Sequence, residues 1–155
     1  MEIKRDYYLK ELIDRLDNGL IKIITGIRRC GKSYLLNTIF KNYLLKQGTD
    51  EKHIIQLSLD ERTNIKYLDP DELDEYIRSL IIDEKKYYIL LDEIQEVKEI
   101  ESVWIGFMHI NNVEIYVTGS NSKFLSSDIV TEFRGRGDEI RVYPLSFAEF
   151  YSVYE

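Results

Sequence analysis

The hydrophobic positions of the chain follow two spacings in turn. Short runs dense in isoleucine, leucine, valine and tyrosine predict buried strands, and stretches with an apolar residue every three or four positions predict amphipathic helices. The predicted strands are 20–25, 53–59, 87–91, 113–118 and 139–143. The predicted helices start near Leu9, Ser33, Pro70, Trp104 and Ser146. Strands and helices alternate for most of the chain, which is typical of an α/β protein whose parallel sheet is covered on both faces.

Two helix starts carry capping signals. Asp69 is placed to cap a helix that has Pro70 at its first position and Glu72 three residues after the cap. Ser146 and Glu149 form a similar capping box close to the end of the sequence. Either a short terminal helix closes the domain there, or the sequence belongs to a longer protein, and we favour the second. No internal repeat or low-complexity linker divides residues 1–155, so we expect a single domain.

Composition narrows the class of protein. The chain has 155 residues and a net charge of −7, which argues against binding of duplex nucleic acid by this segment alone. Its single cysteine, Cys30, excludes an internal disulfide and favours a reducing, cytoplasmic location. The first residues lack the apolar core of a signal peptide, and no apolar stretch is long enough to span a bilayer. We therefore expect a cytoplasmic protein without a membrane partner.

A phosphate-binding loop follows the first predicted strand. Residues 26–33 read Gly-Ile-Arg-Arg-Cys-Gly-Lys-Ser and fit the Walker A pattern G-x-x-x-x-G-K-[ST] at every fixed position. Glycines let the backbone curl so that successive N–H groups point at phosphate oxygens, and the next helix presents its N-terminus to the same anion. Lys32 is placed to reach the β- and γ-phosphates, and the Ser33 hydroxyl to bind magnesium. The pattern predicts a P-loop nucleotide site.

The remaining loop residues carry weaker signals. The predicted nucleotide-binding residues are Gly26, Ile27, Arg28, Arg29, Cys30, Gly31, Lys32, Ser33 and Tyr34. The two arginines either contact the nucleotide or a neighbouring subunit, or pair with surface carboxylates. Cys30 is interpreted as a small filler rather than a nucleophile. The only histidines are His53 and His109, so a zinc or Cys/His catalytic site is not expected, and both histidines are interpreted as structural.

Two acidic residues end the third predicted strand. Asp92 and Glu93 follow the apolar run 87–91, and open α/β sheets bind ligands at the carboxyl ends of their strands. Asp92 is the candidate magnesium ligand, as the Walker B aspartate is, and Glu93 the candidate acceptor of a proton from the attacking water. A glutamate in this place favours water as the nucleophile, and therefore an ATPase.

Polar residues after the fourth strand are candidates for the same site. Ser120 or Asn121 is placed to bond the γ-phosphate or the water, unless these residues form an ordinary polar turn that caps the next helix. Arg134 and Arg136 follow, and an arginine here either contacts ATP bound to a neighbouring subunit or belongs to a solvated basic loop.

Together these segments resemble a family of prokaryotic AAA-type ATPases. The matching segments, in the order of the family, are 25–36 with its G-x-R-R-x-G-K-S loop, Leu-Leu-Asp-Glu-Ile-Gln at 90–95, Val-Thr-Gly-Ser-Asn at 117–121, Gly-Arg at 135–136, and Tyr-Pro-Leu-Ser-Phe-Ala-Glu-Phe at 143–150. The resemblance implies a three-layer P-loop NTPase fold with strand order 5-1-4-3-2. It also implies Ser120 as the sensor and Arg136 as the arginine finger. Family members continue into a helical segment and a nuclease-like domain of unknown function.

We expect from these motifs an ATPase core that uses ATP and Mg²⁺, with Glu93, Lys32, Ser120 and Arg136 as its catalytic residues. A nucleotide-dependent switch that controls an attached domain would use the same residues and is the alternative. A small-molecule kinase or nucleotidyl transferase fits less well, since the sequence shows no separate lid. The guanine-reading motif Asn-Lys-x-Asp is absent, which favours ATP. Homo-oligomers, and DNA or a protein client bound through regions beyond 155, are the expected partners.

Overall fold

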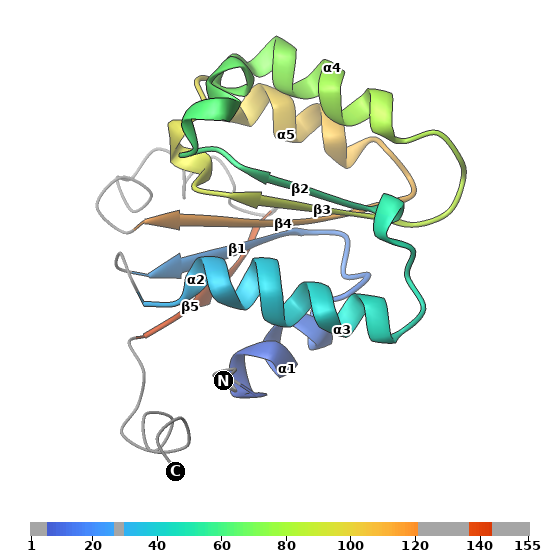
Figure 1. Ribbon diagram of the computed structural model, residues 1–155, viewed down its shortest axis with the longest axis vertical. Coiled ribbons are helices and arrows are strands. Elements are labelled where there is room, and N and C mark those ends of the chain that lie inside the picture. The colour runs from blue at the N-terminus through green and yellow to red at the C-terminus, as the bar shows by residue number, and fades with distance from the viewer. Residues whose placement is uncertain (1–5, 27–29, 121–136, 144–155) are drawn as a thin grey trace.

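Five parallel strands build the centre of the computed structural model, which describes residues 6–26, 30–120 and 137–143 (Figure 1). The strands are β1 (Ile21–Gly26), β2 (Ile54–Ser58), β3 (Tyr87–Asp92), β4 (Val113–Ser120) and β5 (Gly137–Arg141). They pair in the order β2-β3-β4-β1-β5, and every pairing is parallel. The three-layer P-loop NTPase fold and the strand order 5-1-4-3-2 are thereby confirmed.

Helices cover both faces of the sheet (Figure 1). One layer contains α4 (Pro70–Leu80) and α5 (Ile100–Met108). The other contains α1 (Asp6–Asp14) and a continuous helical segment that consists of α2 (Lys32–Tyr34), a π-helical stretch (Leu35–Phe40) and α3 (Lys41–Lys46). The predicted α-helix from Ser33 therefore exists but is partly π-helical, a form that is common near functional sites. No helix in the described part of the chain is long and apolar enough to cross a membrane.

Alternate residues of the central strands feed two separate hydrophobic clusters. Ile89 and Leu91 of β3 face the cluster under α4 and α5, whereas Leu90 between them faces the cluster under α1 to α3. This alternation is the period of two that a strand imposes on its side chains. Trp104 and Phe40 are among the largest fully buried side chains, one in each cluster. The strand pattern of the sequence reflects burial on both faces.

Some ends of helices and strands that local sequence signals predict agree with the structure, and others do not. The Asp69 cap is confirmed, because its carboxylate accepts hydrogen bonds from the N–H groups of Asp71, at 2.9 Å, and Glu72, at 3.4 Å. The last strand begins and ends two residues earlier than predicted, since Gly137–Arg141 pairs with Ile21–Thr25. A 3-10 helix at Arg62–Leu68 carries no clear periodic signal and was not expected. The predicted capping box of Ser146 and Glu149 lies outside the described residues.

Candidate functional site

The loop that follows β1 is built around two glycines. A Cβ atom on Gly26 would lie 2.5 Å from the main-chain oxygen of Val142 and 2.7 Å from Sγ of Cys30, so this position has no room for a side chain. Gly31 has φ 94°, in the left-handed region that favours glycine, and it directly precedes the helix that starts at Lys32. The tight path of the chain therefore explains why this loop contains glycine at both positions.

Lys32 lies against the loop rather than in solvent. Its side chain is buried, and Nζ donates a hydrogen bond of 2.8 Å to the carbonyl oxygen of Gly26. The ammonium group is therefore held at the carboxyl end of β1. This is the place where a lysine can reach an anion seated on the loop amides.

Asp92, at the end of β3, contacts the segment that follows β1. The Ser33 hydroxyl lies 2.9 Å from Oδ1 and 2.8 Å from Oδ2 of Asp92, and Thr118 of β4 donates a hydrogen bond of 2.5 Å to Oδ1. Burial raises the pKa of the Asp92 carboxyl group, the hydrogen bonds from Thr118 and Ser33 lower it, and the charges of Glu93 and Asp60 raise it. The net direction is upward, because burial is the largest of these effects.

Glu93 is held in an unusual backbone conformation. Its φ of 59° and ψ of 56° lie in the left-handed region, which a residue with a Cβ adopts rarely. The Glu93 N–H donates to the Thr118 hydroxyl at 2.9 Å, which ties this conformation to β4. The Ser120 hydroxyl, at 3.2 Å, and the side-chain amide of Gln95 both donate to Oε2 of Glu93. Within the described part of the chain, Oε1 of Glu93 receives no hydrogen bond, so this atom remains able to accept one from a bound molecule.

These groups border one hollow at the carboxyl edge of the sheet. Its volume is about 490 Å³, within the usual range for small-molecule sites. The lining residues are Gly31, Lys32, Ser33, Tyr34, Asp60, Glu93 and Glu96. Lys32, Ser33, Asp92, Glu93 and Ser120, which the sequence places on three separate segments, are thus brought together through hydrogen bonds and a shared hollow. Ile27, Arg28, Arg29, Asn121, Arg134 and Arg136 lie outside the described residues.

Three participants were not singled out from the sequence. Thr118 reads as an ordinary strand residue, although it bonds both Asp92 and Glu93. In the sequence, Gln95 belongs to the family-matching segment 90–95 without an assigned role, and Asp60 belongs to no matching segment. Each lies close to the carboxyl end of a parallel strand, where polar residues gather around a ligand. That position is the signal that could have found them. His53, in contrast, pairs with Asp83 at 3.0 Å, away from this hollow.

The donor set fits a magnesium ion coordinated together with phosphate oxygens. Mg²⁺ is usually bound by one or two carboxylates, water and substrate phosphate, rather than by a cage of protein ligands. Ser33 and Asp92 supply a hydroxyl and a carboxylate within 3 Å of each other. No group of three or more histidine, cysteine or acidic residues in the described segments could hold a metal ion by itself. A shared site with a nucleotide is the arrangement that these residues permit.

Several solved structures have a similar fold. The chain superposes with a TM-score of 0.67 on closed-state Hsp104 bound to ATPγS and casein, at 12% identity, over 97% of this chain and 28% of that one. A DNA polymerase III gamma subunit-related protein of Thermotoga maritima gives a TM-score of 0.61 at 11% identity, over 95% of this chain and 48% of that one. At these identities the likeness establishes the fold.

Sequence relatives are closer. An uncharacterized protein of Haemophilus influenzae is 36% identical over 149 residues, which are 96% of this chain and 37% of that protein. MJ1544, an uncharacterized protein of Methanocaldococcus jannaschii, is 30% identical over 152 residues, which are 96% of this chain and 31% of that protein. The chain thus spans about a third of the length of these curated relatives. Residues 18–151 match the family described as AAA domain, and this chain is a member of that family.

Proposed function

We propose that this chain binds ATP with Mg²⁺ and hydrolyses it to ADP and phosphate. The observation that supports this most directly is the contact of Ser33 with both carboxylate oxygens of Asp92, because it joins the phosphate loop to the acidic strand. Membership of the AAA domain family supports nucleotide binding in general. The details of hydrolysis rest on the geometry of the site.

The loop that follows β1 would bind the triphosphate. The N–H groups of the loop and the start of the following helix would hold phosphate oxygens, and Lys32 would leave the Gly26 carbonyl to contact the β- and γ-phosphates. Ser33 and Asp92 would hold the magnesium ion, which when bound neutralises charge on those oxygens. The proposed nucleotide-binding set is therefore the loop from Gly26 through Tyr34.

Glu93 would act on the attacking water. Ser120 and Gln95 fix its Oε2 atom, so that Oε1 is directed to accept a proton as the water oxygen bonds the γ-phosphorus and ADP leaves. A positioned carboxylate base accelerates a reaction by about 10²–10⁴. Ser120 would also sense the γ-phosphate, because its single hydroxyl proton can be donated either to Glu93 or to a phosphate oxygen. The hydrogen bonds around Glu93 are consistent with a base that is oriented before the substrate arrives.

The complete ATPase would be larger than this site. Arg136, which lies outside the described residues, would complete the site of a neighbouring subunit, so homo-oligomers would turn over faster than single chains. We propose residues 1–155 as the ATPase core of a longer protein, in keeping with the length of the relatives. A DNA or protein client would be bound through the remaining regions.

Magnesium-dependent phosphate release by the full-length protein tests the proposal. Glu93→Gln should keep ATP binding and lower turnover by about 10²–10⁴, whereas Lys32→Ala should lose ATP binding. Glu75→Gln is a matched control, because Glu75 is an exposed residue of α4. An unchanged rate in Glu93→Gln would remove Glu93 from the chemistry. Wild-type turnover far below one per minute, with ATP changing the oligomeric state, would instead identify a nucleotide-dependent switch.

A further inference from the structure

Strand β2 forms one edge of the sheet, and among the strands that the structure describes it pairs with β3 alone. The N–H of Leu59, which directly follows β2, donates to the Asp92 carbonyl of β3 at 3.0 Å. Main-chain polar groups of successive residues point to opposite sides of a strand. The N–H and C=O groups of Ile54, Gln56 and Ser58 therefore face away from β3, toward the open edge.

Part of this edge is already capped. The Ile54 N–H donates to the Glu51 carbonyl, and the Ser58 carbonyl accepts from the Glu61 N–H at 3.3 Å and the Asn64 side-chain amide at 2.8 Å. Four groups are left without a protein partner within the described segments: the Ile54 carbonyl, both main-chain groups of Gln56, and the Ser58 N–H. In their order along β2 they form the donor and acceptor row that an added strand requires.

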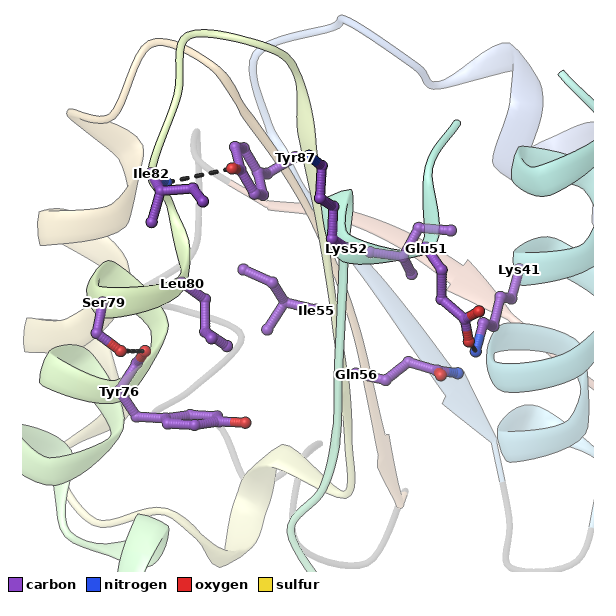
Figure 2. Close-up of a pocket in the computed structure, with 11 residues that line it drawn as sticks. Lys41, Glu51, Lys52, Ile55, Gln56, Tyr76, Ser79, Leu80, Ile82 and Tyr87 are labelled. Atoms are coloured by element: carbon purple, nitrogen blue, oxygen red, sulfur yellow. Dashed lines mark hydrogen bonds and ion pairs between the residues drawn. The ribbon is translucent and has the colours of Figure 1, made fainter. Parts of the chain in front are cut away.

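A hollow of about 410 Å³, lined by apolar and polar residues, lies beside this edge (Figure 2). Ile55, Tyr76 and Leu80 point into the space between β2 and α4, as the close-up shows. Ile82 stands at its margin with 75% of its surface exposed, an unusual exposure for an isoleucine. The hollow borders the first residues of β2 and β3, so it lies at the amino ends of these strands. The phosphate loop lies at the opposite, carboxyl ends of the strands.

The charged residues that line the hollow are Lys41, Glu51 and Lys52, so its margin carries one excess positive charge. Lys41 is paired with Glu51 at 3.1 Å, but Lys52 is exposed and pairs with no carboxylate in the part of the chain that the structure describes. A free lysine on a chain with a net charge of −7 marks a local site that attracts an acidic group. The margin therefore complements a carboxylate that lies next to the strand.

We propose that the β2 edge docks an extended peptide segment of a partner protein, in which an apolar residue is flanked by an acidic one. The peptide extends the sheet by one strand through the Ile54, Gln56 and Ser58 main-chain groups. Its apolar side chain enters the hollow between Ile55 and Leu80, and its carboxylate pairs with Lys52. Main-chain hydrogen bonds supply affinity in such strand addition, and side-chain pockets supply specificity. The site is independent of the proposed ATPase chemistry.

Selection from a random twelve-residue peptide library displayed on phage tests this docking site. We expect the selected peptides to share an apolar residue next to aspartate or glutamate. Fluorescence anisotropy with the most enriched peptide, labelled with fluorescein, then compares variants. Lys52→Glu should weaken binding about three- to tenfold, and Lys10→Glu, an exposed lysine of α1, should leave it unchanged. Gln56→Pro should weaken binding at least tenfold, because it removes the outward N–H at an edge position that tolerates proline.

Amide hydrogen exchange of the wild-type chain provides a readout that does not depend on how a variant folds. Binding should slow exchange at the Gln56 and Ser58 N–H groups, which a contact made by side chains alone would leave unprotected. Failure to enrich any peptide, or enrichment of peptides that bind Gln56→Pro as well as wild type, would overturn the proposal. In the absence of peptide, the exchange protection of the Gln56 N–H could instead rise with protein concentration. That result would assign the edge to a second copy of the chain and would overturn the proposal of a docked peptide.

Discussion

Replacement of Thr118 by valine tests whether the hydrogen bonds around the two acidic residues organise the site. The Thr118 hydroxyl donates to Asp92 and accepts from the Glu93 N–H, and the residue is fully buried. Valine has almost the same shape, so the substitution removes the two hydrogen bonds and little else. It would leave a main-chain N–H and one carboxylate oxygen of the site with fewer partners than before.

The expected loss is substantial for one substitution. A polar group left unsatisfied inside a protein costs about 1–3 kcal/mol. Since two groups are affected and Asp92 keeps its bonds to Ser33, we expect the free energy of unfolding to fall by about 2–4 kcal/mol. For a chain of this size that lowers Tm by roughly 5–15 °C. Release of Glu93 from its left-handed conformation should also lower ATP turnover, provided that the proposed function holds.

Thr25 offers a matched control on the neighbouring strand β1. It is equally buried, but its hydroxyl has no hydrogen-bond partner among the residues that the structure describes. Thr25→Val removes an unsatisfied polar group and should leave stability unchanged or raise it. Thermal and urea denaturation followed by circular dichroism compares the two variants. A loss in Thr25→Val equal to that in Thr118→Val would refute the role assigned to the Thr118 hydroxyl.

Three further substitutions have definite expected outcomes. Gly26→Ala should cost about 1–3 kcal/mol of stability by overpacking and weaken nucleotide binding, because its Cβ would collide with Val142 and Cys30. Tm measures the loss of stability, and titration with a fluorescent nucleotide measures the loss of binding. Asp92→Asn should abolish magnesium-dependent turnover yet raise Tm at pH 7. The reason for the gain in Tm is that burial raises the Asp92 pKa, so the ionised carboxylate disfavours folding. The gain should shrink as the pH falls toward the ordinary pKa of 3.8, where wild-type Asp92 becomes protonated. Asp69→Ala should lower stability by about 1 kcal/mol through loss of the α4 cap, and a denaturation midpoint equal to that of wild type would contradict this.

Much of the fold follows from short-range patterns. Each strand was placed by its apolar run, and the start of α4 by Asp69 and Pro70, because these signals depend on neighbours in the sequence. The strand order does not follow from such patterns and was available only through the family resemblance. The motifs alone locate Lys32 on one segment and the pair Asp92 and Glu93 on another. The parallel sheet then brings the carboxyl ends of β1 and β3 to the same side of the molecule.

Features that depend on pairing between distant segments could not be predicted. Lys22 is the second residue of β1 and is only 1% exposed, because its ammonium group pairs with the buried Glu114 of β4. Nothing near Lys22 in the sequence indicates this partner. The hydrogen bonds of Thr118 arise in the same way, from the registry of β4 beside β3. The left-handed conformation of Glu93 has no sequence signal either, since it is a residue with a Cβ in a place where glycine would be expected.

Isothermal titration calorimetry of this chain with ATP, in the presence and absence of magnesium, addresses the central claim most directly. We predict saturable binding of one nucleotide per chain that is strengthened by magnesium and is lost in Lys32→Ala, with the circular dichroism spectrum of that variant unchanged. Heats that are indistinguishable from dilution for the wild-type chain with magnesium, or equal affinity in wild type and a folded Lys32→Ala, would contradict a phosphate site at this loop.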